Sequence, residues 1–518
     1  ATMPVKVVIK QSTYFDSVSL MSLSTKANQI EGIEQAVVAM ATEMNKGVLR
    51  NVGLHVAEID AAGNGDLLIV IKAPSAERCE SALIEIEALF GQRQKSRSGD
   101  EVKYATLDSA VRQVAGANLA IISVPGEHAV REAWKALADN LHVMLFSDNV
   151  GVDDEVALKH AAHDKGLLVM GPDCGTAIIG HVGLCFANAV RRGNIGIVGA
   201  SGTGSQEVSV RIHDFGGGIT QLIGTGGRDL SERVGGIMMI DAMRALAADP
   251  ATAVIVLVSK PPARSVEQKV LAEIKGCDKP VVVCFLGGSE TSVVRAGGHF
   301  ARTTEEAAWK AVLLGGVKED EVTPRPVSPL LVEAVRDKLG RDQRYIRGLL
   351  CGGTLCDELM FLAREKYPNV YSNIAKDPAH RLADVNESRE HTFIDFGDDE
   401  FTRGRPHPMI DPSLRIDRIL REARDPAVGV IVMDFILGFG AHEDPAGITL
   451  PAILESKELA AREGRHLEIL GYVLGTDGDM PSMADQTRKL VSAGVTVARS
   501  CTNAGLLARG FVEKGVQS

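Results

Sequence analysis

The sequence predicts an α/β protein built from several doubly wound, mostly parallel sheets. Short apolar segments alternate with helix-length segments along almost all of its 518 residues, which is typical of parallel strands joined by helical crossovers. Aromatic residues make up 4% of the chain and glycines number 53, a balance that suits sheets covered by helices, whose connecting turns need glycine. A chain of this length holds about three or four domains.

The order of the predicted strands divides the chain into four units. The charged segment Gly91–Glu101 and the proline-rich segment Lys318–Pro329 are predicted to be linkers. The predicted domains cover residues 1–95, 102–190, 191–325 and 340–518, the first of them a small α/β domain. The strands are expected at residues 5–10, 35–40, 66–72, 119–123, 143–147, 167–170, 194–198, 220–223, 253–258, 280–285, 345–351, 391–396, 428–435, 467–473 and 495–499.

Charge and composition exclude several classes of protein. A formal net charge of −11 argues against a general nucleic-acid-binding protein. No apolar run reaches the roughly 18 residues of a membrane span, and the start ATMPVKVVIK lacks the layout of a signal peptide. The eight cysteines show neither CxxC pairs nor metal-ligand spacing, so we expect reduced thiols, a cytoplasmic location and no metal.

The most informative segment is Gly193–Glu207, written GNIGIVGASGTGSQE. An apolar strand leads through Ser201, Gly202, Thr203 and Gly204 into an amphipathic helix. Unpaired backbone amides and the positive end of the helix dipole then surround one point, where small residues let a phosphate come close. The segment matches neither the dinucleotide fingerprint nor the Walker pattern, and the alternative is a tight turn without a ligand.

A second segment has the same layout. Cys351–Cys356 follows the apolar strand YIRGLL and begins a helix, which makes Gly353 and Thr354 a second candidate phosphate site. One such segment is weak support for a function, whereas six or more polar loops at strand ends are hard to dismiss as plain turns.

Further candidate ligand loops follow other strands, because ligands of open α/β sheets collect beyond the carboxyl ends of the strands. The first holds Gly171, Pro172, Asp173 and Cys174. Cys174 is either a nucleophile or, as is more common for a small thiol in a tight turn, inert.

The next two loops each carry a cation. Gly226, Gly227 and Arg228 follow one strand, and Arg228 either clamps a carboxylate or phosphate or pairs with Asp229 on a solvated loop. Lys260 ends the strand VIVLVS, and it either reaches an anionic substrate or is an ordinary solvated lysine.

A last candidate loop runs from Gly404 to Pro412, after the acidic segment FGDDE. We expect Arg405 to hold a substrate carboxylate and His407 to act as an acid or base. The acids nearby match no recognised metal-ligand spacing, and the alternative is a loop that its prolines merely shape.

Together these segments resemble the succinyl-CoA synthetase superfamily. IGIVGASGTGSQE is similar to the helix that faces the phosphohistidine of the synthetase α subunit, MGPDCGT to the loop beside the CoA thiol, and GTGGRD to another glycine-rich loop of that subunit. FIDFGDDEFTRGRPHPMIDP and VIVMDFILGFG resemble the carboxyl-terminal part of the β subunit. Through DSVSLM, LFSDNV, GRDLS and GRPHPMIDP, residues 3–512 are identified as a member of the FdrA family of acyl-CoA-synthetase-like proteins.

The resemblance implies an α-like part fused to a β carboxyl-terminal-like part, with no ATP-grasp domain. By this resemblance, residues 102–190 form a Rossmann-like domain of the CoA-binding type. Residues 191–325 and 340–518 form ligase-type flavodoxin-like domains. Residues 1–95 replace the loop that grips CoA in the synthetases, and the phosphohistidine loop is shortened, with only His299 nearby. No cofactor is therefore assigned, and CoA stays an open alternative.

The family is associated with oxamate carbamoyltransferase activity in the breakdown of purine ureides, and carbamoyl phosphate is itself an acyl phosphate. The resemblance thus implies an enzyme, or enzyme subunit, that handles an acyl phosphate and a carboxylate substrate. The alternatives are a carbamoyltransferase subunit active only with a separate partner subunit, a non-catalytic scaffold that binds a metabolite, and an authentic acyl-CoA synthetase. A homo-oligomer is expected, and neither nucleic acid nor a membrane is an expected partner.

Overall fold

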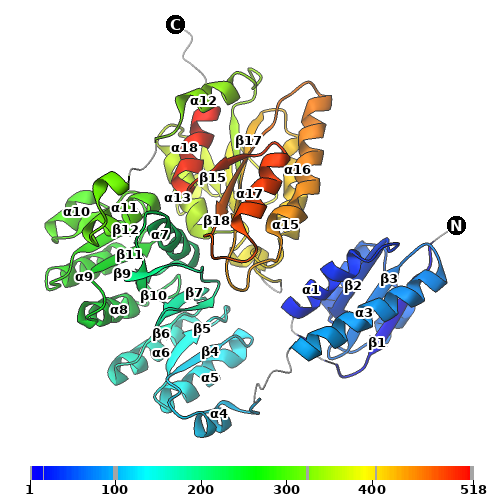
Figure 1. The fold of residues 1–518 in the computed structure, drawn as a ribbon, viewed down its shortest axis with the longest axis horizontal. Helices are drawn as coiled ribbons and strands as arrows, with labels where there is room; N and C mark the ends of the chain where they lie inside the picture. The colour runs from blue at the N-terminus through cyan, green and yellow to red at the C-terminus, as the bar shows by residue number, and fades with distance from the viewer. Residues whose placement is uncertain are drawn as a thin grey trace. The chain divides into compact units, whose positions relative to one another are not determined.

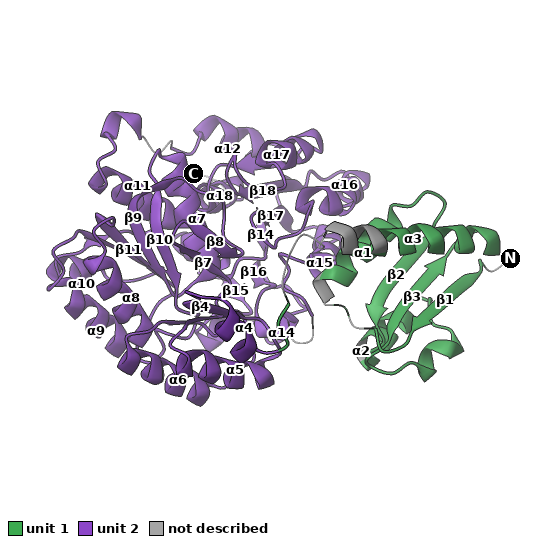
Figure 2. Cartoon of the chain, turned by 60° about the horizontal axis from the view of Figure 1, so that its bottom comes forward, with its two compact units in different colours: residues 1–105 green, residues 106–518 purple. Residues whose placement is uncertain are grey.

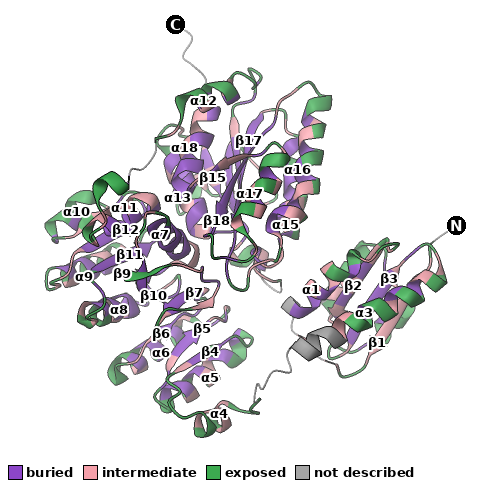
Figure 3. Cartoon of the chain, viewed as in Figure 1, coloured by how far each residue is buried: buried purple, intermediate pink, exposed green. Residues whose placement is uncertain are grey.

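The computed structural model describes residues 3–13, 15, 17–96, 103–322, 326–402 and 405–513. The chain divides into two compact units, residues 1–105 and residues 106–518 (Figure 2). In each unit the buried side chains lie along the strands and on the helix faces that cover them (Figure 3). None of the helices within the described ranges is long and apolar enough to cross a membrane.

The amino-terminal unit is built on a three-stranded antiparallel sheet. Strand β3 (Leu67–Lys72) lies between β1 (Val5–Lys10) and β2 (Gln35–Met40) and runs opposite to both. The strand positions agree with the sequence, but this sheet is antiparallel and its third strand lies between the first two. One face is covered by α1 (Ser17–Asn28) and α3 (Ala76–Ser96), and the other by α2 (Glu43–Asn51) and η1 (Ala57–Ala61).

The predicted linker Gly91–Glu101 is wrong in its first half. Helix α3 continues to Ser96, because glutamine, arginine and lysine are strong helix formers whatever their charge. Residues 97–101 lie outside the described residues.

The second unit begins with a small parallel sheet, whose strands β4, β5 and β6 lie in chain order (Figure 1). Helices α5 and α6 make the two crossovers, and α4 precedes the first strand. The elements are α4 (Leu107–Gln113), β4 (Leu119–Ile122), α5 (Gly126–Ala138), β5 (His142–Leu145), α6 (Val152–Lys165) and β6 (Val169–Met170).

A seven-stranded sheet follows, in the order β13-β12-β11-β9-β10-β7-β8. Strands β9 to β13 are parallel, and the hairpin of β7 and β8 adds two antiparallel strands at one edge. Helices α7 and α11 cover one face, and α8 and α9 cover the other. The strands are β7 (Thr176–Ile179), β8 (Val182–Cys185), β9 (Arg192–Gly199), β10 (Ile219–Gly224), β11 (Val254–Ser259), β12 (Val281–Phe285) and β13 (His299–Phe300). The helices are α7 (Gly202–Asp214), α8 (Ile237–Ala248), α9 (Arg264–Ile274), α10 (Glu290–Arg295), α11 (Thr304–Leu314) and η2 (Glu319–Glu321).

The hairpin is a feature that the sequence did not indicate. Its two strands have four residues each, too few for a clear alternation of apolar and polar residues. The sequence placed residues 176–185 in the preceding domain, whereas the structure pairs them with the seven-stranded sheet.

The last sheet is parallel throughout, in the order β15-β16-β14-β17-β18-β19. Helices α12, α13 and α18 cover one face, and α15, α16 and α17 cover the other. Its strands are β14 (Tyr345–Leu350), β15 (Val370–Ser372), β16 (His391–Asp395), β17 (Val428–Ile436), β18 (Glu468–Leu474) and β19 (Thr496–Ala498). The helices are α12 (Pro329–Arg336), α13 (Gly353–Arg364), η3 (Pro378–His380), α14 (Asp399–Thr402), α15 (Ser413–Ala423), α16 (Pro445–Arg462), α17 (Met483–Ser492) and α18 (Cys501–Phe511).

The predicted α/β architecture of mostly parallel sheets is thus confirmed. Of the predicted linker Lys318–Pro329, residues 323–325 lie outside the described residues, and the segment before them contains η2. Helix α7 from the seven-stranded sheet packs against α13 from the six-stranded sheet (Figure 1). This contact joins the two sheets at the carboxyl ends of β9 and β14.

Candidate functional site

Helices α7 and α13 begin in direct contact. The Ser201 hydroxyl is hydrogen-bonded to the Thr354 hydroxyl. A Cβ on Gly204 would lie 2.7 Å from Ser201 Oγ and 2.8 Å from Thr354 Cγ2, so glycine is needed for the two turns to approach this closely. The structure therefore brings together the two segments that the sequence singled out as phosphate sites.

The first turns of both helices hold amides that are free to bind an anion. Ser201 accepts a hydrogen bond from the Gly204 amide at 3.0 Å, whereas Gly352 gives α13 no side-chain cap. Each helix start carries about half a positive charge, so two in contact repel each other until an anion binds. The amides of Gly202, Thr203, Gly353 and Thr354 make no hydrogen bond to any residue that the structure describes.

Lys260 lies beside these helix starts. Its Nζ is 3.5 Å from Asp357 Oδ2 and 3.9 Å from Asp395 Oδ2, and a Cβ on Gly353 would lie 2.9 Å from that Nζ. The Lys260 side chain is 40% exposed, so it pairs with two carboxylates and is still accessible to a ligand. The alternative of an ordinary solvated lysine is not supported.

Asp395 is a site residue that the sequence analysis missed. It ends β16, is 4% exposed, and accepts a hydrogen bond from the Gly397 amide at 2.8 Å. Burial raises the pKa of its carboxyl to about 7, although the nearby Lys260 acts in the opposite direction. A carboxyl that titrates near neutral pH suits proton transfer. The available indication was an acid that directly follows the apolar residues Phe393 and Ile394 at the end of the strand.

Asp434 fixes the turn that leads into α13. Its two carboxylate oxygens accept hydrogen bonds from the amides of Cys351 and Gly352, both at 2.8 Å. Arg415 compensates the buried charge of Asp434 at 2.8 Å. This arrangement holds the turn before α13 in a fixed conformation.

His407 lies at the same strand ends, against the ring of Phe186. Its Nδ1 accepts a hydrogen bond from the Met409 amide at 3.2 Å, which places the proton of the neutral ring on Nε2. Burial lowers the pKa of His407 to about 4, so the imidazole is uncharged at neutral pH. A Cβ on Gly397 would lie 2.7 Å from Nε2. His407 is therefore suited to donating a fixed hydrogen bond, and the acid–base role expected of it fits Asp395 better.

Arg228 belongs to a partly buried ion-pair network. Its Nε lies 3.0 Å from Glu155 Oε2, and it donates to the Val150 carbonyl at 2.8 Å. The alternative pairing with Asp229 is wrong, because Asp229 is fully buried and pairs with Lys159 at 2.8 Å. The Arg228 side chain remains 42% exposed, which leaves part of its guanidinium accessible to a ligand.

The two predicted glycine-containing loops pack on each other. Gly226 has a φ of +86°, and a Cβ there would lie 2.5 Å from the Pro172 carbonyl oxygen. Gly171 also has a positive φ, of +118°, and a Cβ there would overlap the Leu145 carbonyl. Gly227 faces open space. Only glycine permits this close approach of the two loops.

Asp173 and Cys174 are neighbours in the sequence, but they differ in exposure to solvent and in the pKa of their side chains. Asp173 is exposed, yet the protein atoms crowded around its carboxyl, and then the nearby carboxylates, raise its pKa to about 7, while Arg228 and Lys260 lower it. Asp173 therefore lies close enough to Arg228 and Lys260 for their charges to act on it. The Cys174 thiol is buried and donates to the Thr176 carbonyl at 3.6 Å, and burial raises its pKa to about 12. Such a thiol stays protonated, which favours the inert alternative.

Two predicted residues are not brought into this cluster. Arg405 is exposed and makes no ion pair with any residue that the structure describes. Gly404, where its loop starts, lies outside the described residues. His299 is exposed on the edge strand β13.

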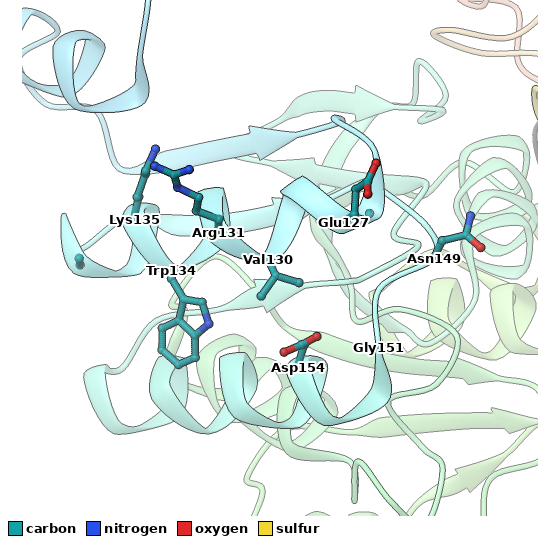
Figure 4. Close-up of a pocket in the computed structure, with 10 residues that line it drawn as sticks. Glu127, Val130, Arg131, Trp134, Lys135, Asn149, Gly151 and Asp154 are labelled. Carbon is teal, nitrogen blue, oxygen red and sulfur yellow. The ribbon is translucent and has the colours of Figure 1, made fainter. Parts of the chain in front are cut away.

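A separate open groove of about 780 Å³ runs along α5 (Figure 4). Val130 and Trp134 project from α5 toward Asp154 at the start of α6. The groove is lined by acidic Glu127 and Asp154 and by basic Arg131 and Lys135, so its charge does not select an anion. A Cβ on Gly126 would lie 2.3 Å from the Asp148 carbonyl oxygen, so a carbonyl already covers the first turn of α5.

Three protein-family models match the chain. The model described as "CoA-ligase" matches residues 349–511, and the model described as "CoA binding domain" matches residues 190–287. The latter match falls on the seven-stranded sheet, whereas the sequence predicted a CoA-binding-type fold for the preceding residues 102–190. The model described as "AllF, heavy metal-associated domain" matches residues 3–106.

The amino-terminal unit does not fit a heavy metal. Its only described cysteine, Cys79, is buried, and its thiol donates to the carbonyls of Pro4 and Ile71 at 3.7 and 3.8 Å. Across the described residues, no group of three or more His, Cys, Asp or Glu side chains converges as metal ligands do. The match therefore concerns the fold of that domain.

Relatives span the whole chain or parts of it. The chain is 61% identical over 516 residues to the protein YahF of Escherichia coli (strain K12), with 100% of both chains covered. It is 27% identical over 241 residues to the α subunit 2 of the ADP-forming succinate–CoA ligase of Archaeoglobus fulgidus, which covers 44% of this chain and 81% of that one.

Solved structures match the chain at low identity and low TM-score. The dinucleotide-forming acetyl-coenzyme A synthetase 1 of Ca. Korarchaeum cryptofilum, in its apo form, has a TM-score of 0.35 at 14% identity and covers 80% of this chain and 87% of that one. The ATP citrate lyase of Methanothrix soehngenii, with citrate and coenzyme A, has a TM-score of 0.35 at 13% identity, with 79% and 83% covered.

Proposed function

This chain belongs to the FdrA family of acyl-CoA-synthetase-like proteins, in the succinyl-CoA synthetase superfamily, and we propose that it transfers the acyl group of an acyl phosphate. One observation carries the proposal. Two long helices from different sheets begin in contact, at Ser201 and Thr354, beside the cation Lys260 and the carboxyl group of Asp395. Free amides, a cation and an acid–base group are the parts that such a transfer needs.

The phosphate of the substrate lies at the two helix starts. The amides of Gly202, Thr203, Gly353 and Thr354 bind its oxygens, and Lys260 neutralises part of its charge. These donors are held by the fold before the substrate arrives, so they stabilise the departing phosphate without reorganisation. An acyl phosphate is already activated, and its transfer needs no ATP.

The remaining groups act on the acceptor and on the acyl group. The acceptor nitrogen attacks the acyl carbon while the bond from that carbon to the phosphate oxygen breaks, and Asp395 takes the proton from the nitrogen. The Nε2–H of His407 donates to the acyl oxygen as negative charge develops there. The exposed part of Arg228 holds the carboxylate of the acceptor.

Carbamoyl phosphate is the acyl phosphate that we favour, with oxamate as the acceptor. A CoA-dependent ligase is the second candidate, favoured by the match of residues 190–287 to a CoA-binding domain. A separate subunit that activates the chain, and association of the chain with itself, are part of the same proposal.

The test is turnover with the full chain. Carbamoyl phosphate and acetyl phosphate are supplied with and without oxamate or CoA, and the release of phosphate is followed. We expect oxamate-dependent release from carbamoyl phosphate, reduced at least a hundredfold in Lys260→Gln and unchanged in the remote surface variant Lys275→Gln. Release that requires CoA would favour the ligase, and a chain that neither binds nor turns over any acyl phosphate would contradict the proposal.

A further inference from the structure

The buried hydroxyl of Thr176, which lies near the start of α7, has no hydrogen-bond partner among the described residues. Thr176 is the first residue of β7 and is 2% exposed. Its Oγ1 makes no hydrogen bond to any residue that the structure describes. Burying a hydroxyl without a hydrogen bond costs free energy, so such groups are rare and mark a place where a ligand or water completes the site.

The Thr176 hydroxyl lies in front of α7. Gly202 is the first residue of that helix, and a Cβ on Gly202 would lie 3.6 Å from Thr176 Oγ1, with no other nearby side chain or backbone within 4 Å. Bonds from Cα to Cβ tilt toward the start of a helix. The Thr176 hydroxyl therefore lies at the same end of α7 as the free amides. Gly202 and Thr203 are themselves only partly buried, which leaves the helix start open to solvent.

Buried threonines elsewhere in this fold are satisfied. Thr304 donates to Glu358 and Thr449 donates to the carbonyl of Pro445, both at 2.7 Å. Thr220 shares a hydrogen bond of 2.7 Å with Thr252. The residues that follow Thr176 in β7 are Ala, Ile and Ile, so an apolar residue would suit the packing of this strand. A hydroxyl at this position needs another explanation.

We propose that the Thr176 hydroxyl is a further ligand of the phosphate group at the start of α7. The inference rests on the proposed function, which places that phosphate at the same helix start. The donors come from three elements, β7, α7 and α13, and therefore approach from different directions. This spread suits the oxygens of a tetrahedral phosphate better than the two oxygens of a planar carboxylate.

Three variants of the full chain test the role of Thr176. Thr176→Val keeps the branched shape and removes the hydroxyl, Thr176→Ser keeps the hydroxyl, and Thr220→Val removes a buried hydroxyl whose partner is known. Affinity for inorganic phosphate and for carbamoyl phosphate is measured by calorimetry, and thermal unfolding is followed without ligand.

We expect Thr176→Val to weaken phosphate binding roughly 10- to 100-fold, the worth of one hydrogen bond to a charged group. Its unfolding midpoint without ligand should equal or exceed that of the wild type, because an unpartnered hydroxyl is lost. Thr176→Ser should bind phosphate like the wild type, and Thr220→Val should lower the midpoint without changing affinity.

The outcomes separate this inference from the proposed function. Equal phosphate affinity of Thr176→Val and the wild type would overturn the inference alone. A midpoint of Thr176→Val lowered as far as that of Thr220→Val would show a structural partner for the hydroxyl and would also overturn it. If the wild type binds neither inorganic phosphate nor carbamoyl phosphate, both the inference and the proposed function are wrong.

Discussion

Replacing Asp395 by asparagine should stabilise the protein while it removes activity. Burial raises the pKa of the Asp395 carboxyl in the folded chain from its ordinary value of 3.8 to about 7. Because the folded pKa lies above the unfolded one, folding favours the protonated form, and ionisation of Asp395 costs stability. The wild type therefore loses stability as pH rises from about 4 to about 7, and the loss is constant above that range.

The size of this cost follows from the two pKa values. The linkage relation gives about 2 kcal/mol at pH 5 and about 4 kcal/mol at pH 8. Asparagine has nearly the same shape and still accepts the Gly397 hydrogen bond, but it carries no charge to bury. Asp395→Asn should thus gain stability over the wild type, and the gain should grow by about 2 kcal/mol between pH 5 and pH 8.

Calorimetric unfolding of both proteins at pH 5, 6, 7 and 8 measures the difference. Asp434→Asn is the matched comparison, because Asp434 is equally buried but pairs with Arg415 at 2.8 Å. Neutralising Asp434 leaves Arg415 unpaired in the interior, so this variant should be less stable at every pH. The reasoning is refuted if Asp395→Asn is destabilised at pH 8, or if its gain does not change with pH.

Three further variants or measurements probe the rest of the site. Gly353→Ala should weaken phosphate binding at least tenfold with its fold intact, because the new Cβ would lie 2.5 Å from Asp395 Oδ2 and 2.9 Å from Lys260 Nζ. Gly276→Ala, in open surroundings, is the control. Equal phosphate affinities of the two variants would count against the site. Histidine ring NMR should show His407 uncharged and protonated on Nε2 down to about pH 5, since its pKa is lowered to about 4; titration near pH 6.5 would disprove this. At pH 8 iodoacetamide should modify the half-buried Cys277 and spare Cys174, whose pKa is raised to about 12, and rapid labelling of Cys174 would contradict an inert thiol.

Much of the fold could be predicted because local patterns of apolar and polar residues indicate its helices and strands. The apolar runs that became β11 and β12 are continuous, as strands buried on both faces are. The glycine-rich turns before α7 and α13 were also visible in the sequence. The hairpin of β7 and β8 was not, because strands of four residues carry little pattern.

The chemistry of the site depends on tertiary contacts and was harder to predict. The low pKa of His407 arises where its ring packs against Phe186, far away in the sequence. Lys159 is fully buried between Glu155 and Asp229, and nothing in its helix distinguishes it from a solvated lysine. The role of Asp395 likewise depends on burial, which a single strand does not reveal.

The central claim is that an acyl phosphate binds where α7 and α13 begin. The most direct test is calorimetric titration of the full chain with carbamoyl phosphate and, separately, with CoA, repeated for Lys260→Gln and Gly353→Ala. The account predicts binding of carbamoyl phosphate by the wild type, weakened by about 1–3 kcal/mol in each variant, whether or not CoA binds. Binding of CoA alone, or carbamoyl phosphate affinity that neither substitution changes, would contradict it.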